Sequence, residues 1–373
     1  MPIFIDLRKD RSATCWRRLK MAGVTEEAAK RRIKCFFVHS REELLTLAAA
    51  YTEPSSLVLL LASNKEIREA KAEYADIPMP IIVFAHHIYD PLADEFSYVM
   101  SDLSGSMRRA MAHLEAQGAT RPALFAVNYH SNHDYCRVQT FKRITGIEDP
   151  LVFDLSQGVT VCVRKLLACK EPIDALLCTN DFCALRLMHV LDMLDMDWNR
   201  KMLMLGFTDS NLSALHAPAL TSTSLNYFAA GQEVVSLHRR LAKNTEVAHL
   251  HTVMESKLQK RESTAAFHPC GIRFSELAPL NDAALADSLR LSDRAMVLEN
   301  LLGEADDTTL RLLLGLLREQ STERIAAELF FSKDNVLYHL RKIRHALHTE
   351  STKELCALLR RWVDADALEA YIQ

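Results

Sequence analysis

IDALLCTNDFCALRLMHVLDMLDMDWNRKMLMLGF, residues Ile173 to Phe207, begins and ends with short apolar runs and has a helical pattern between them. The runs Ile173 to Thr179 and Lys201 to Phe207 have the length of strands, and the segment Phe182 to Leu194 has the length of a helix. Strands that are apolar on both faces and joined through a helix are typical of a parallel sheet covered on two sides. The segment therefore predicts an α/β fold.

The same alternation extends in both directions from this segment. A first series of apolar runs and helical stretches leads from Ile3 to the run Ile77 to Ala85, and the alternation restarts after a break at Asp90 to Tyr98. Two series in one chain predict two lobes, each a doubly wound parallel sheet, with a cleft between them. Beyond Thr264 only helical patterns remain, and beyond Asp306 we expect a small all-α domain of three or four short helices.

Composition limits the classes of function. The chain has 373 residues, a net charge of −3 and nine cysteines that form no C-x-x-C pair. We therefore expect reduced thiols, and any binding to nucleic acid must come from a local basic face rather than from overall charge. The N-terminal MPIFIDLRKD lacks the apolar stretch of a secretory signal, which favours a cytoplasmic protein.

Most of the first 264 residues resemble the effector domain of the LacI/GalR type, which has a periplasmic-binding-protein-like fold. The resemblance rests on SYVMSDLSGSMRRAMAHLEAQGATRPALFAV, on IDALLCTNDFCAL, on the segment after Gly206 and Phe207, and on KLQKREST. It implies a sensor that binds a small molecule between two lobes.

The resemblance also suggests domain boundaries. Residues 1–264 would form the effector domain, in which lobe 1 covers about 1–97 with a returning segment near 225–250, and lobe 2 covers about 98–224 with the closing strand. Residues 265–305 would form a helical connector, and residues 306–373 a DNA-binding domain.

In such a fold ligands bind at the carboxyl ends of the strands. Arg137 lies where the family has an arginine that grips the ligand, and a guanidinium suits a carboxylate or vicinal hydroxyls. We expect the pocket to include Arg137, Asp181, Asn180, Thr208, Asp209, Asn128, His86, Arg8 and Asn64.

Two features of this pocket stay open. The family usually has an aspartate directly after Gly-Phe, whereas this chain has Thr208 there and Asp209 next, so the class of ligand is not fixed by the resemblance. Asp181 precedes an apolar helical run, and it could simply cap that helix, with or without a role in binding.

A metal site or a catalytic site is a weaker interpretation. His130, His133, Asp134 and Cys136 fall in one loop, but their spacing matches no established zinc site. The motifs G-x-S-x-G, G-x-x-x-x-G-K-[ST], G-x-G-x-x-G and H-E-x-x-H do not occur, so we expect no cofactor and no enzyme, although an α/β enzyme without a motif is the less favoured alternative.

The C-terminal segment LRLLLGLLREQSTERIAAELFFSKDNVLYHLRKIRHALHTESTKELCALLRRWV resembles the helix-turn-helix of the LuxR/GerE type. Ser332 is placed to cap the second helix, and Val336, Leu340, Ile343 and Leu347 form an apolar stripe along it. The family's usual glycine before the first of the two helices is missing in the region of Glu319 and Gln320.

The face opposite the stripe carries the groups expected to contact DNA. Arg341 has the chemistry to read guanine with two hydrogen bonds, whereas Leu337 and Tyr338 would make apolar contacts in the major groove. The predicted DNA-contacting residues are Lys333, Asn335, Leu337, Tyr338, Arg341, Lys342 and Arg344. The segment between Ser321 and Arg361 contains eight Lys or Arg and five Asp or Glu. This mild excess of positive charge also allows a helical module for protein contact.

Together these patterns predict a ligand-responsive transcription regulator whose partners are double-stranded DNA and a small effector, sugar-like or bearing carboxylate or hydroxyl groups. We expect a homodimer, because one small helix-turn-helix contacts too little DNA for a unique site. Two surfaces could pair: the first lobe, and the apolar connector positions Leu285, Leu289, Met296, Leu298 and Leu302. The alternative is a small-molecule binding protein whose helical tail contacts another protein.

Overall fold

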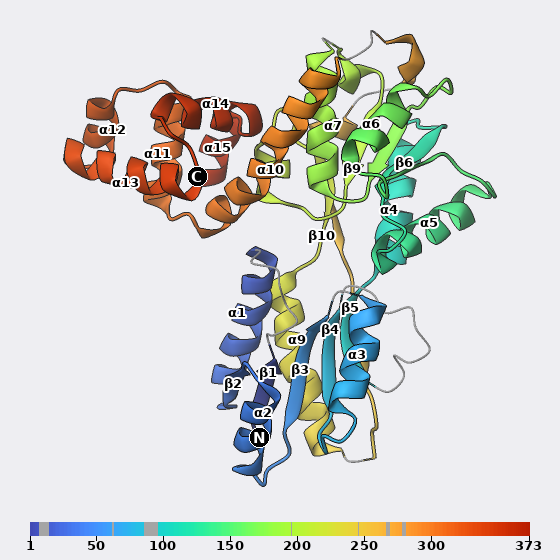
Figure 1. Ribbon diagram of the computed structural model, residues 1–373, viewed down its shortest axis with the longest axis vertical. Coiled ribbons are helices and arrows are strands. Elements are labelled where there is room, and N and C mark those ends of the chain that lie inside the picture. Colours follow the sequence, from blue (N-terminus) through green and yellow to red (C-terminus); the bar gives the residue numbers. More distant parts are fainter. Residues whose placement is uncertain are drawn as a thin grey trace. The chain divides into compact units, whose positions relative to one another are not determined.

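The computed structural model describes residues 1–6, 15–61, 63–85, 96–194, 196–244, 246–265, 269–277 and 281–373, with the backbone alone at 15, 64, 282–284 and 286–293. The chain forms two compact units, each built around one sheet (Figure 1). The first comprises Met1–Arg108, Tyr129–Gly146 and Leu225–Lys257, and the second comprises Arg109–Asn128, Ile147–Ser224 and Leu258–Gln373.

The first unit contains a six-stranded sheet in which all neighbouring strands are parallel. Its strand order is β11 (His251–Met254), β5 (Ser97–Ser101), β4 (Ile81–Ala85), β3 (Ser56–Leu61), β1 (Ile3–Asp6) and β2 (Cys35–Val38). Its helices are α1 (Cys15–Lys30), α2 (Arg41–Ala49), α3 (Asn64–Tyr74), the start of α4 (Leu103–Ala116), α5 (Asn132–Thr145) and α9 (Tyr227–Lys243).

Both faces of this sheet are covered, which explains the uninterrupted apolar run of β3. Val58 and Leu60 pack in a cluster with residues of α1 and α9, whereas Leu57 and Leu59 pack in a separate cluster with residues of α2 and α3. Alternate side chains of a strand point to opposite faces, so a strand between two helical layers needs apolar residues at every position.

The second unit has its own six-stranded sheet. Its strand order is β12 (Lys257–Gln259), β10 (Thr221–Ser224), β9 (Leu203–Gly206), β8 (Ala175–Cys178), β6 (Pro122–Val127) and β7 (Val152–Asp154). The helices within this part of the chain are α6 (Val159–Leu167), α7 (Asp181–Met193) and the short α8 (Asn211–Leu215), with 3-10 turns at Trp198–Arg200, Glu262–Thr264 and Phe274–Glu276. The expected fold class, two α/β lobes followed by a helical region, is confirmed.

The helical region belongs to the second unit. It consists of α10 (Asp282–Glu304), α11 (Asp307–Leu317), α12 (Thr322–Glu328), α13 (Lys333–Ala346), α14 (Thr352–Trp362) and α15 (Ala365–Ile372). Five helices thus follow Asp306, rather than three or four, because the last stretch forms α15 after a break at Val363. One apolar core runs from the second sheet through α10 to these helices.

The long helix α10 corrects one expectation about pairing. Leu285, Leu298 and Leu302 are almost fully buried in the core of the second unit. Helix α10 packs there against α6, α7 and α8, and Figure 1 shows it beside α7. These apolar positions are therefore satisfied within one chain and do not offer a surface for a dimer. Met296 is half-buried, and the side chain of Leu289 lies outside the described residues.

None of the helices in the described ranges is both long enough and apolar enough to cross a membrane.

Candidate functional site

Asp181 is the centre of a buried hydrogen-bond network at the carboxyl ends of the second sheet. Its side chain is fully buried, Oδ1 accepts from Ser222 Oγ at 2.6 Å, and Oδ2 accepts from the main-chain N–H of Ser210 at 2.7 Å. Burial raises the pKa of this carboxyl, and the hydrogen bonds from Ser222 and Ser210 act in the opposite direction. The carboxylate therefore ties the end of β8 to the loop after β9.

Gly206 makes this close approach possible. A Cβ atom at this position would lie 2.2 Å from Asp181 Oδ1, closer than any non-bonded contact allows. Position 206 therefore requires glycine, because any side chain there would clash with the Asp181 carboxylate.

Helix α7 is capped by Asn180 and not by Asp181. Asn180 has extended backbone geometry and its Oδ1 accepts from the N–H of Cys183 at 3.0 Å, so Asp181 is the first helical residue. The interpretation of Asp181 as the helix cap is therefore wrong by one residue. Whether Asn180 and Asp181 also contact a ligand stays a prediction.

Thr208 and Asp209 are held from both sides. Ser222 Oγ accepts from the main-chain N–H of Thr208 at 3.1 Å and of Asp209 at 3.0 Å, and Thr208 Oγ1 accepts from the N–H of Asp181 at 3.1 Å. Asp209 has a left-handed backbone with φ 51°, and its carboxylate pairs with Arg261 at 2.6 Å. The Asp209 carboxylate thus already has a cationic partner within the second unit.

Arg137 is buried on α5 in the first unit and forms an ion pair with Asp134, one turn earlier, at 2.8 Å. Asn128 follows β6 directly and is half-buried. Arg8 and His86 lie outside the described residues, as does the side chain of Asn64. A shared pocket for the predicted ligand-binding residues remains a prediction.

The candidate metal ligands do not lie in one loop, because His133, Asp134 and Cys136 belong to α5 and only His130 precedes it. Asp134 pairs with Arg137, and Cys136 Sγ lies 3.5 Å from Ser104 Oγ. In the part of the chain that the structure describes, no three His, Cys, Asp or Glu side chains are grouped to hold a metal ion.

Ser222 and Arg261 were not identified from the sequence. Arg261 lies in KLQKREST, but nothing in that segment indicates that its guanidinium reaches Asp209. Ser222 is separated from Asp181 by 41 residues, and a serine in a strand carries no signal for its partner.

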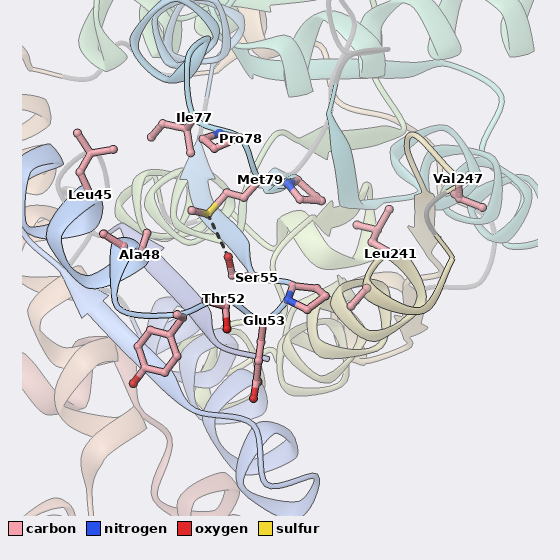
Figure 2. Close-up of a pocket in the computed structure, with 15 residues that line it drawn as sticks. Leu45, Ala48, Thr52, Glu53, Ser55, Ile77, Pro78, Met79, Leu241 and Val247 are labelled. Carbon is pink, nitrogen blue, oxygen red and sulfur yellow. Dashed lines mark hydrogen bonds between the residues drawn. The ribbon is translucent and has the colours of Figure 1, made fainter.

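A second feature of the first unit is a half-open pocket of about 720 Å³ (Figure 2). It lies where β3 and β4 begin, which is the opposite end of the sheet from the predicted ligand-binding residues. Tyr51, Pro78, Met79 and Leu241 supply much of its apolar wall, and Ser55 Oγ lies 3.9 Å from Met79 Sδ. No pattern in the sequence indicated this pocket.

In the C-terminal segment predicted to form a helix-turn-helix, the short turn 329–332 joins α12 to α13. Ser332 caps α13, since its Oγ accepts from the N–H of Asn335 at 3.2 Å. Val336, Leu340, Ile343 and Leu347 are buried, as the stripe predicted, and they share a core with Ile325 and Ala326 of α12.

The turns around α12 use left-handed residues where glycine is usual. Glu319 has φ 56° after α11, and Phe330 has φ 55° after α12. The expected glycine is thus replaced by a residue that adopts the same backbone, at a cost of about 1 kcal/mol. Glu319 also pairs with Arg360 at 2.6 Å, which holds it in place.

The outward face of α13 carries most of the predicted DNA-contacting groups. Leu337 and Tyr338 are 37% and 60% exposed, and Lys333, Arg341 and Lys342 are exposed as well. The contacts of these side chains within the chain are local: Lys333 Nζ lies 2.5 Å from Glu323 Oε1, and Arg341 Nε donates to the Leu337 carbonyl at 3.3 Å.

Asn335 and Arg344 are half-buried. Arg344 donates through Nη2 to the carbonyl oxygen of Glu350, beyond the end of α13. This contact gives Arg344 a structural role in the turn before α14, and a contact to DNA remains a prediction.

Comparison with known proteins supports the fold. A model of the periplasmic-binding-protein-like domain matches residues 111–264. No curated protein matches the sequence.

Several solved structures are similar in fold to about seven tenths of the chain. A complex of the transcriptional regulator CelR with cellobiose is 19% identical, with a TM-score of 0.56, and covers 70% of this chain and 84% of its own. A LacI family transcriptional regulator from Enterococcus faecium with bound ribose is 17% identical, with a TM-score of 0.54, and covers 72% and 99%. The lac repressor dimer bound to operator and an anti-inducer is 17% identical, with a TM-score of 0.56, and covers 71% and 82%. At these identities the likeness is one of fold, and the α/β units have the periplasmic-binding-protein-like architecture.

Proposed function

We propose that this chain is a ligand-responsive transcription regulator, with an effector site in the α/β units and a LuxR-type helix-turn-helix formed by α12 and α13. The observation that carries the proposal is the division of α13 into two faces. Val336, Leu340 and Ile343 are buried against the neighbouring helices, whereas Tyr338, Arg341 and Lys342 are exposed on the other side.

The geometry of α13 suits the major groove of DNA. A helix fits this groove when one face is fixed by its own domain and the other presents side chains that reach base edges and phosphates. Arg341 has the donors to recognise guanine, and Lys342 has the charge to contact a phosphate. Because the whole chain carries a charge of −3, attraction to DNA depends on this local face.

The effector site is proposed at the carboxyl ends of the strands, where parallel sheets of this kind bind ligands. Asn128, Asn180 and Arg137 offer amide and guanidinium groups for hydroxyls or a carboxylate. Solved relatives in fold carry cellobiose and ribose, which supports a small polar effector. The Asp209 carboxylate already pairs with Arg261. The proposed effector therefore relies more on amide and guanidinium groups than on this carboxylate.

A second candidate function is contact with another protein through the same helices. Phe330 in the turn between α12 and α13 is 96% exposed, and an exposed aromatic side chain also suits a protein partner. DNA is favoured because the exposed cations Arg341 and Lys342 lie on α13 together with the exposed Tyr338, which gives one helix groups for both phosphates and base edges.

Binding of the full chain to duplex DNA tests the proposal. Titration of a labelled random duplex at low salt should give salt-sensitive binding, because phosphate contacts release counterions. The DNA function would be refuted if no duplex bound at low salt while the chain was folded. In that case protein contact becomes the better account of α12 and α13.

A further inference from the structure

The short helix α8 is held at both ends by parts of the chain that are far apart in sequence. It spans Asn211–Leu215 and follows the loop that carries Thr208 and Asp209. Its start bonds to the Asp181 network, to α10 and to α15, and its end bonds to α15, so three neighbours determine its position.

The first neighbour is the strand-end network around Asp181. Ser210, the N-cap of α8, donates its main-chain N–H to Asp181 Oδ2 at 2.7 Å. The Oγ of the same residue accepts from the N–H of Ser213 at 3.1 Å, so Ser210 joins the network to the first turn of α8. A change in the partners of Asp181 therefore acts directly on the start of this helix.

The second neighbour is Glu299 of α10, which is almost fully buried. Its Oε1 accepts from the main-chain N–H and the side-chain Nδ2 of Asn211, and its Oε2 accepts from the N–H of Leu212, all at 2.9 Å. Burial of a carboxylate costs free energy unless such hydrogen bonds offset it. The contact between Glu299 and the start of α8 is therefore stable only while these bonds keep their geometry. A displaced α8 must pull α10 with it or leave this charge without its bonds.

The third neighbour is α15, the last helix of the chain. The N–H of Asp364, which caps α15, donates to the carbonyl oxygen of Leu215 at 2.6 Å. Tyr371 Oη donates to Asn211 Oδ1 at 3.0 Å. Asn211 thus contacts α10 through its amide nitrogen and α15 through its amide oxygen.

We propose that α8 is the element through which the strand-end site controls the C-terminal helices. Binding of an effector near Asn180, Asp181 or Thr208 changes the hydrogen bonds of the strand-end network and shifts α8. Glu299 and Asp364 transmit that shift to α10 and α15, which pack in one core with α11 to α14. This regulation rests on the proposed function, but the linkage itself can be measured without DNA and without knowing the effector.

The test uses hydrogen–deuterium exchange of the full chain, with Asp181→Asn and Ser222→Ala as two separate perturbations of the strand-end network. Each should speed exchange about tenfold in α8, and also in α15 and the second half of α10, since a weakened buried hydrogen bond lowers the free energy of local opening. Glu299→Gln should speed exchange in α8 and α10. Glu304→Gln, which changes an exposed residue of the same helix, should leave exchange in both helices unchanged.

A matched control exists at the opposite end of β8 from Asp181. Asp174 is a fully buried carboxylate near the start of β8 that accepts from Thr120 and from the N–H of Arg121, each at 2.8 Å, and it has no bond to α8 among the described contacts. Asp174→Asn should leave exchange in α8 and α15 unchanged.

The linkage is overturned if Asp181→Asn and Ser222→Ala affect only the residues up to Leu215, or if Asp174→Asn loosens α15 equally. Duplex binding by the wild-type chain, measured in parallel, reports on the proposed function alone. Linked exchange without DNA binding would support the linkage through α8 and refute the DNA function. DNA binding without linked exchange would support the DNA function and refute the linkage.

Discussion

The main-chain N–H of Asp364 donates a 2.6 Å hydrogen bond to the carbonyl oxygen of Leu215, which joins the first residue before α15 to the last residue of α8. The bond connects the C-terminal helices to the α/β part of the same unit. Trp362 lies two residues before it and is almost fully buried, with its ring 6.1 Å from that of His189 and 6.5 Å from that of His216. The C-terminal helices thus pack on the α/β part of the second unit and do not form a tethered domain.

The first prediction concerns Asp181. Asp181→Ala should lower the free energy of unfolding by about 2–4 kcal/mol, because it leaves the hydroxyl of Ser222 and the buried N–H of Ser210 without their acceptor. Asp197→Ala, which removes an exposed carboxylate paired with Arg200, should change it by less than about 0.5 kcal/mol. Urea denaturation measures both, and equal small effects would contradict the structural role of Asp181.

The sequence indicated Asp181 as a pocket residue or a helix cap, and neither interpretation predicted its bonds to Ser210 and Ser222. The alternation of apolar runs and helices was sufficient to predict both sheets, because a strand such as β3 shows in its own composition that both faces are buried. The stripe of α13 likewise indicated its buried face. In each case the signal is local.

Features that depend on distant partners could not be predicted in this way. Glu299 meets Leu212 across 87 residues, and nothing in the pattern around either residue points to the other. The apolar face of α10 was visible, but periodicity does not say whether such a face packs inside the chain or against a second copy. For the same reason the pairing of Asp209 with Arg261 was not foreseen.

The second prediction concerns pH. Burial, with the nearby charge of Arg361, lowers the pKa of His189 from 6.5 to about 4, and burial lowers the pKa of His216 as well. The folded state therefore disfavours the protonated rings, so their contribution to stability is present above pH 6.5 and is lost as pH falls toward 4. Because both rings flank Trp362, acid should loosen the packing of α14.

Urea denaturation at pH 7.5 and pH 5 tests this sign. The wild-type chain should lose stability between the two pH values, and His189→Gln should lose less, because the substituted side chain takes up no proton. An identical loss in the variant would show that His189 does not contribute to the acid sensitivity.

The third prediction concerns assembly. We expect the full chain to be a dimer in solution, because two helix-turn-helix units double the DNA footprint and restrict binding to paired half-sites. Since Leu298 and Leu302 of α10 are buried within the chain, Leu298→Asn should destabilise the monomer and not act selectively on pairing. Light scattering at micromolar concentration measures the mass, and a monomer that binds DNA one-to-one would contradict the dimer.

The fourth prediction separates two basic residues of α13. Arg344→Ala should lower stability, because Arg344 is half-buried and donates to the Glu350 carbonyl, whereas Lys342→Ala should leave stability within about 0.5 kcal/mol of the wild-type value. Thermal unfolding of the two variants gives the comparison. Equal stability in both would mean that the Glu350 contact does not support the turn.

The most direct test of DNA binding by α13 is the salt dependence of duplex binding by the full chain and three variants. Arg341→Ala should weaken binding to a preferred sequence by about 1–3 kcal/mol if it reads a base, and Lys342→Ala should weaken all sequences alike and reduce the slope of log affinity against log salt by about one. Arg200→Ala, an equally cationic and exposed change on the α/β part, should leave the slope unchanged. If the wild-type chain binds with a salt slope that Arg341→Ala and Lys342→Ala leave unaltered, or does not bind duplex at all, then α13 is not the DNA-contacting helix.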